Sequence, residues 1–139
     1  MMTKRRLATI LVALSLVIGS NVLAVEMSAE MEKAIGDLMD MITSHTSIIE
    51  TNMDDPEKAM TEIQAYCAAN GDKIKQAYKT IQEEEAKMSP EDKEAFEKQM
   101  EETYKGEIEA YEKAMQGFTE KHPDIAMKFL EAMGACMPE

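Results

Sequence analysis

The sequence predicts an all-α protein: a small antiparallel helical bundle of three long helices plus a short C-terminal fourth, closed by one disulfide. Three observations support this fold class. Apolar residues recur every three or four positions through nearly all of residues 25–139, which is the period of a packed helix face. Capping residues and prolines divide that stretch at three places. The only two cysteines, Cys67 and Cys136, both lie within it.

The first 24 residues have a different composition from the rest of the chain. A basic start at residues 4–6 precedes an almost entirely apolar run at residues 7–18, and small residues at Val22 and Ala24 fit a signal peptidase site. We expect residues 1–24 to be a signal peptide cleaved between Ala24 and Val25, and residues 25–139 to be one exported domain, periplasmic or secreted. An uncleaved anchor is the alternative. The apolar run is shorter than the roughly 20 residues of a bilayer span, so we expect no stable membrane insertion after cleavage.

The first long helix is expected over residues 28–51. Ser28 can cap its N-terminus, and its apolar face carries His45 among aliphatic residues and methionines. Small polar residues at 43–47 compete for backbone hydrogen bonds, so a kink could occur there.

The second long helix is expected to begin at Pro56, with Asp55 as its cap, and to run to about Met88. The Asn70–Gly71 pair often ends a helix. The apolar face keeps its phase across this pair, which favours one continuous helix with Asn70 as a buried, register-fixing residue.

The third helix is expected from Pro90 to about Lys121, capped by Ser89. The residues 122–124 then turn the chain into a short fourth helix, which Gly134 ends.

A disulfide between Cys67 and Cys136 follows from this arrangement. Export to an oxidising compartment favours a disulfide, and the spacing of the two cysteines fits no zinc or redox motif. If consecutive helices are antiparallel, the fourth helix runs back along the second for about 18 Å, which places Cys136 level with Cys67.

The expected exported domain is strongly acidic. The signal peptide holds three of the 15 basic residues and none of the 27 acidic ones, which leaves 12 lysines against 27 acidic residues, a net charge of −15. This charge disfavours nucleic acid and anionic lipid and favours cationic partners. Solubility alone is the simpler explanation of the same charge.

Methionine is unusually frequent, with twelve of the fourteen methionines outside the signal peptide. Such residues fill irregular gaps between helices, or form an adaptable surface for apolar clients. A third interpretation is a Cu(I) site. Met41 and His45 share one helix face, and Met60 of the next helix is expected at a similar level, so the three could converge on copper. A haem ligated by His45 belongs to the same hypothesis.

The motifs of several enzyme classes are missing from the sequence. It has no Glu-x-x-His pair, no HExxH and no Gly-rich phosphate loop. Ser44 and His45 are adjacent, so on a helix their side chains diverge and cannot form a nucleophile–base pair. We therefore expect no catalytic activity and no cofactor other than the alternative copper.

The leading functional expectation is a non-enzymatic exported interaction protein, such as a chaperone-like holdase, an adaptor or an inhibitor of a basic partner. Its expected partners are basic or partly unfolded proteins. The alternatives are a metal- or haem-binding bundle that uses His45, and a plain structural protein of the cell envelope.

Overall fold

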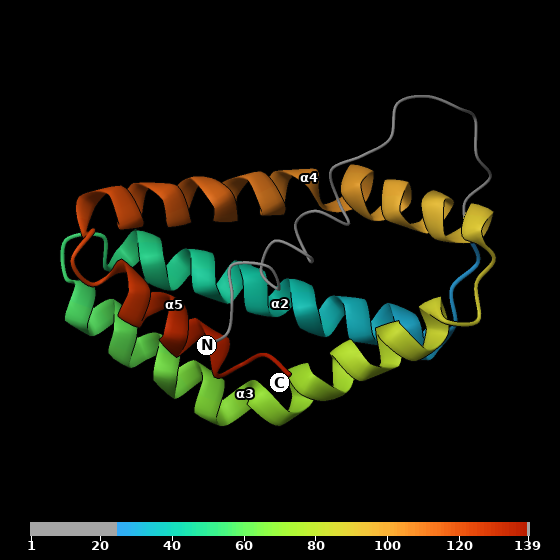
Figure 1. Cartoon of the computed structure of the whole chain (residues 1–139), viewed down its shortest axis with the longest axis horizontal. Coiled ribbons are helices and arrows are strands. Elements are labelled where there is room, and N and C mark those ends of the chain that lie inside the picture. Colours follow the sequence, from blue (N-terminus) through green and yellow to red (C-terminus); the bar gives the residue numbers. More distant parts are fainter. Residues whose placement is uncertain (1–24, 139) are drawn as a thin grey trace.

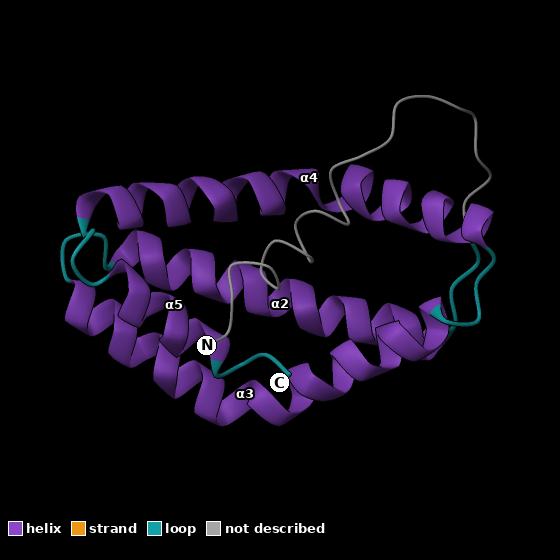
Figure 2. Cartoon of the chain, in the orientation of Figure 1, coloured by secondary structure: helices purple, strands orange, loops and turns teal. Residues whose placement is uncertain are grey.

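The computed structural model describes residues 25–138, so the predicted signal peptide and its cleavage position at Ala24 lie outside the described residues. The described chain forms α2 (Ala29–Thr51), α3 (Pro56–Glu85), α4 (Pro90–Lys121) and α5 (Ala126–Gly134). Residues 25–138 contain helices, turns and loops but no strand (Figure 2). The predicted fold class, three long helices and a short fourth, is confirmed.

Local capping explains why the three long helices begin where they do. The side chains of Ser28, Asp55 and Ser89 each accept a hydrogen bond from the backbone N–H three residues further on. These bonds satisfy N–H groups that have no partner inside the helix. Proline at the first position of α3 and of α4 strengthens the same signal, because its ring already has a helical φ and it lacks the N–H.

The α2 helix lies in the middle of the bundle, with α3 and α4 on opposite sides of it (Figure 1). Consecutive helices run antiparallel, so α4 runs parallel to α2, and it packs chiefly against α2 rather than against α3. The short α5 lies along the first half of α3. The bundle is therefore arranged around α2, with α5 as a brace on α3.

Two apolar clusters stabilise this arrangement. The larger cluster joins all four helices and includes the fully buried Ile63, Phe118 and Phe129. The smaller one, built on Met31, Ile35 and Phe96, joins the first half of α2 to the first half of α4.

The helical geometry of α4 is interrupted at Tyr104. The part of α4 before this residue contacts the smaller cluster, and the part after it contacts the larger one. Tyr104 has φ −112° and ψ 15°, which is not helical. The kink that the sequence suggested for residues 43–47 is not found, because α2 continues through them. The Thr46 hydroxyl donates to the Ile42 carbonyl of its own helix instead of interrupting it.

The α3 helix is continuous through Asn70 and Gly71, as predicted, but the buried residue of the pair is Gly71. Asn70 is only half-buried and donates to the Tyr66 carbonyl of its own helix, so its predicted role in fixing the register is wrong. A Cβ at Gly71 would lie 3.9 Å from the Ala135 carbonyl oxygen, so the chain after α5 passes directly over this glycine. The helix ends at Glu85, three residues before the predicted end.

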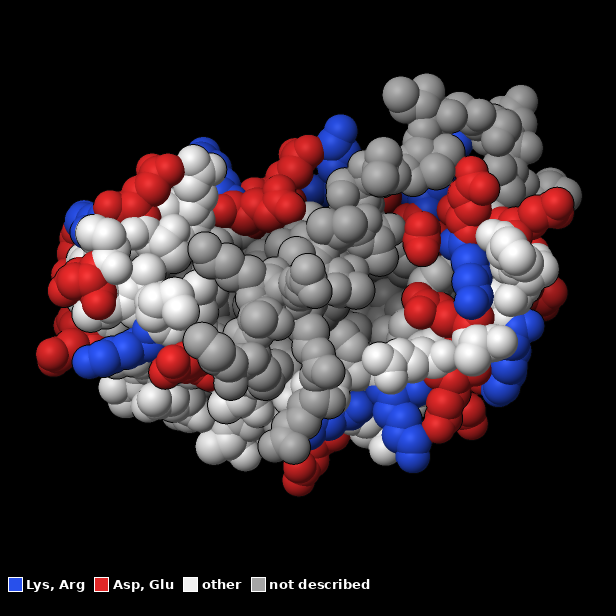
Figure 3. All heavy atoms as spheres, in the orientation of Figure 1, with Lys and Arg blue, Asp and Glu red and all other residues white. Residues whose placement is uncertain are grey.

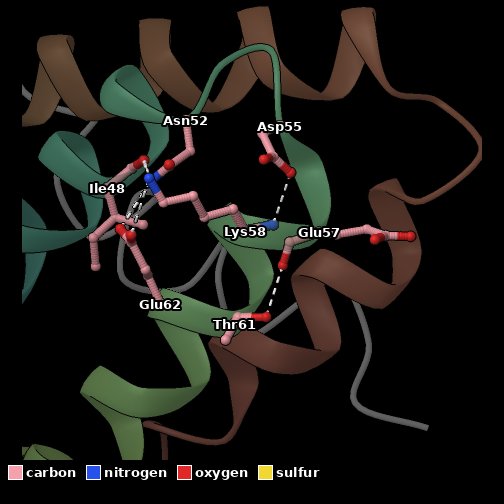
Figure 4. Close-up of polar contacts among 7 residues, drawn as sticks. All are labelled: Ile48, Asn52, Asp55, Glu57, Lys58, Thr61 and Glu62. Carbon is pink, nitrogen blue, oxygen red and sulfur yellow. Dashed lines mark hydrogen bonds and ion pairs between the residues drawn. The ribbon is translucent and has the colours of Figure 1, made fainter.

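Polar contacts hold the connection between α2 and α3 (Figure 4). Asn52 is buried, and its amide donates to the Ile48 carbonyl at 2.9 Å and to Glu62 Oε2 at 2.8 Å. An ion pair between Lys121 and Asp54 ties the end of α4 to the same connection. These contacts fix one end of the bundle, where the chain turns into α5.

Candidate functional site

The Cys67–Cys136 disulfide is present, as the sequence predicted. Cys67 lies on α3 and Cys136 follows α5, with their Cα atoms 4.8 Å apart. Both residues are buried, with exposed fractions of 6% and 0%. The bond fastens the end of α5 to the middle of α3, inside the larger apolar cluster.

His45 is the polar side chain that faces this disulfide. It lies on α2, is 2% exposed, and has its Nε2 3.9 Å from Cys136 Sγ. The ring of Tyr66 meets the imidazole edge-on, with ring centroids 5.2 Å apart. One imidazole and two sulfur atoms thus meet in the interior. They come from α2, from α3 and from the turn that follows α5.

Burial sets the protonation state of this imidazole. Removal from water disfavours the charged form and lowers the pKa of His45 from 6.5 to about 4. The ring is therefore neutral at pH 7, and one of its nitrogens carries a free lone pair.

The potential ligand atoms of His45, Cys67 and Cys136 all lie within 4.8 Å of one another. The sequence instead predicts that His45 lies with Met41 and Met60. Met41 is buried in the larger cluster and Met60 packs against it half-buried. The contact of His45 with sulfur is to the disulfide, and the sequence did not predict this combination. The copper site built on Met41, His45 and Met60 stays a prediction.

The other histidine has a structural position. His122 caps the C-terminus of α4 and its Nε2 lies 2.8 Å from the Met53 carbonyl oxygen. Its ring packs against Phe118 with centroids 5.0 Å apart. His122 is therefore part of the connection that joins α4 to the α2–α3 turn.

Acidic side chains dominate the outside of α4. This helix carries ten acidic residues and five lysines. Glu102, Glu107 and Glu112 are exposed along it. Figure 3 shows acidic side chains, with lysines between them, along the edge of the molecule that α4 forms. We call six of the exposed acidic residues of α4 the α4 acidic surface: Glu94, Glu102, Glu107, Glu109, Glu112 and Glu120.

Most ion pairs on the surface of the described chain are local, and one of them lies on α4 itself. Lys79–Glu83 and Lys105–Glu109 are four residues apart on one helix, at 3.8 Å each, and such pairs stabilise a helix by only tenths of a kcal/mol. Asp37 is different, because it pairs with Lys33 on its own helix and with Lys73 on α3. Partial burial acts to raise its pKa, but the two lysines outweigh burial and hold the pKa below the ordinary value.

The methionines lie mainly inside the bundle. Met31, Met41 and Met133 are buried, and most of the others in the described chain are half-buried against the two clusters. Met127, on α5, is the exposed large apolar side chain of residues 25–138, at 63%. The positions of these side chains agree with the interpretation of methionine as core filling.

Comparison with protein-family models, with characterised proteins and with solved structures finds no match to this chain. Within residues 25–138, none of the helices combines the length and the apolar character needed to cross a bilayer. Functional inference therefore rests on two features, the interior site formed by His45 and the disulfide, and the α4 acidic surface.

Proposed function

We propose that this chain is an exported, non-enzymatic interaction protein that binds cationic partners, either basic proteins or basic segments of partly unfolded ones. The observation that carries the proposal is the α4 acidic surface, on a helix whose ten acidic residues and five lysines leave a net charge of −5. A concentrated field of one sign attracts oppositely charged partners and orients them as they approach.

The fold supports this proposal by presenting α4 as an outer layer. The inner side of α4 packs on α2 through Phe96, Tyr111 and Phe118, which leaves its acidic side facing solvent. The disulfide and the contacts at the α2–α3 connection hold the helices that support α4. A rigid helix loses little conformational freedom when a partner binds.

The choice among holdase, adaptor and inhibitor follows from where the apolar residues lie. A holdase for apolar clients needs an exposed apolar surface, and Met127 is the exposed large apolar side chain of the described part. We therefore propose that binding depends on charge complementarity. This mode of binding suits an adaptor or an inhibitor of a basic partner better than a holdase for apolar clients.

The test uses poly-lysine and cytochrome c as cationic probes and a neutral protein as a negative control. We expect binding of the cationic probes that weakens as salt rises from about 0.05 M to about 0.5 M, because screening shortens the reach of the field. A chain that binds neither probe at low salt would contradict the proposal and leave a plain structural role.

A pair of variants localises the binding. The triple variant Glu102→Gln, Glu107→Gln and Glu112→Gln removes three exposed charges from α4, and about 0.5 kcal/mol for each predicts roughly tenfold weaker binding. The matched control Glu32→Gln, Asp40→Asn and Glu50→Gln removes three exposed charges from α2. Equal losses in the two variants would show that net charge, rather than the α4 acidic surface, drives binding.

A further inference from the structure

The structure assigns a second site to this chain: we propose that His45, Cys67 and Cys136 bind a single thiophilic metal ion, Zn²⁺ or Cu⁺, when the disulfide is reduced, and exclude it when the disulfide is formed. This site lies in the interior, away from the α4 acidic surface, and its ligand set differs from the methionine-based site considered above.

The spacing of the three groups fits a bound ion. Zn²⁺ binds thiolate sulfur at about 2.3 Å and imidazole nitrogen at about 2.0 Å, so neighbouring ligand atoms around it are about 3.5 to 3.8 Å apart. His45 Nε2 and Cys136 Sγ are 3.9 Å apart, and all three candidate ligand atoms lie within 4.8 Å. Once the bond between the sulfurs is broken, each needs to move by only about 1 Å to reach this geometry.

The surroundings of the site favour a soft ion over a hard one. Cys67, Cys136 and His45 are buried, and the larger apolar cluster encloses the sulfur atoms. Thiolate and imidazole ligands select Zn²⁺ and Cu⁺, whereas Ca²⁺ and Mg²⁺ require oxygen ligands. Two thiolates and a neutral imidazole around Zn²⁺ form a complex with no net charge, which limits the cost of burial. Cu⁺ needs no fourth ligand, and the thioether of Met41, which belongs to the same cluster, is the candidate for an additional soft ligand.

Reduction requires a dithiol donor, such as a thiol–disulfide oxidoreductase of the same compartment. The dithiol gives two electrons and two protons to the Cys67–Cys136 bond, which becomes two thiols, while the donor becomes a disulfide. Binding of the ion then releases the two thiol protons. Access to the sulfurs requires α5 to lift from α3, and a nine-residue helix is too short to persist without its packing.

The experiment compares the oxidised full domain with the same protein reduced by dithiothreitol and desalted under argon. Native mass spectrometry after addition of Zn²⁺ or of Cu⁺ should show one ion on the reduced chain, with loss of two protons for Zn²⁺, and none on the oxidised chain at the same ion concentration. Co²⁺ in place of Zn²⁺ should give a thiolate-to-metal charge-transfer band. The ion should also protect both thiols from iodoacetamide.

Two histidine variants test the ligand set. His45→Leu keeps both thiols and removes the nitrogen, and we expect at least tenfold weaker binding by the reduced chain. His122→Asn is the matched control and should leave the affinity unchanged, because His122 faces the Met53 carbonyl oxygen at the C-terminal end of α4 and not the disulfide. Met41→Leu distinguishes a thioether ligand from a three-ligand site, since only a ligating sulfur would make this change weaken binding.

The outcomes separate clearly. One ion bound by the reduced chain, with the predicted dependence on His45, supports the site, and the tighter of Zn²⁺ and Cu⁺ identifies the ion. If the reduced chain loses its helical circular dichroism, recovery on adding the ion also supports it. Equal affinity in the oxidised and reduced chains, no effect of His45→Leu, or a reduced chain that stays unfolded with the ion present would overturn it. Binding of cationic probes by the oxidised chain is measured separately and does not depend on this result.

Discussion

His45 shows how one residue can be placed correctly on a helix face while a neighbour, here the disulfide, goes unpredicted. Counting backbone positions from the α2–α3 connection puts His45 level with about residue 62 and Cys67 level with about residue 40. Side chains lean toward the N-terminus of their own helix, by about one turn. In an antiparallel pair, the side chains of the two helices therefore tilt toward each other along the helix axis. The imidazole and the Cys67 sulfur thus come close although their Cα atoms lie at different levels.

The same residue predicts a specific dependence of stability on pH. The folded-state pKa of His45, about 4, lies below the ordinary value of 6.5, so the unfolded chain binds a proton more readily. Its contribution is therefore complete above about pH 6.5 and is lost as the pH falls to about 4, a loss of about 3 kcal/mol in the free energy of unfolding.

Urea unfolding of the oxidised protein at several pH values measures this effect. His45→Leu serves as the reference, because the carboxylates titrate in both proteins and cancel in the difference. A difference between the two proteins that stays constant from pH 7 to pH 4 would be inconsistent with a buried, neutral imidazole.

Helix boundaries were predicted closely because their signals are local. Ser28, Asp55 and Ser89 act within three residues of sequence, and each begins a helix at the predicted position. The break at Tyr104 and the burial of Gly71 rather than Asn70 were not predicted. Neither has a local signal in the sequence: the break lies between the contacts of α4 with the two apolar clusters, and Gly71 is covered by the chain after α5.

The α3 helix yields a prediction at Gly71. Because a Cβ there would be in ordinary contact with the Ala135 oxygen, Gly71→Ala should raise the free energy of unfolding by up to about 1 kcal/mol, the gain in helix propensity. Gly71→Leu should instead lower it by about 1–3 kcal/mol, because the larger side chain displaces the chain beside Cys136.

Thermal and urea unfolding of both variants provide the measurement. Gly36→Ala on α2, where a Cβ would have nothing within 4 Å, is the control for propensity alone. If Gly71→Leu proves as stable as Gly71→Ala, the chain after α5 does not pass over this glycine as described.

For the whole molecule, the disulfide is the main constraint that links distant parts of the sequence. It joins residues 69 positions apart, and closing a loop of that length stabilises the folded state by about 4 kcal/mol in the chain-entropy model. The double variant Cys67→Ala and Cys136→Ala should therefore have a free energy of unfolding that is lower by about 4 kcal/mol, and should unfold at a lower urea concentration. Its amide protons in α5 should exchange faster than those in α2.

Dithiothreitol provides the internal control for that comparison. It should lower the stability of the unmodified protein and leave the double variant unchanged. An unmodified protein that dithiothreitol does not destabilise would show that packing of Phe129 and Met133, rather than the bond, holds α5 in place.

The position of the disulfide in the sequence also determines what a protease can do to this molecule. The second half of α3 and all of α4 and α5 lie between the two cysteines. A single cut there, for example at the non-helical Tyr104, produces two fragments that remain one molecule until a reductant is added. A single cut would therefore leave one band of unchanged mass on a non-reducing gel. The exposed α4 could be cleaved without either fragment being released.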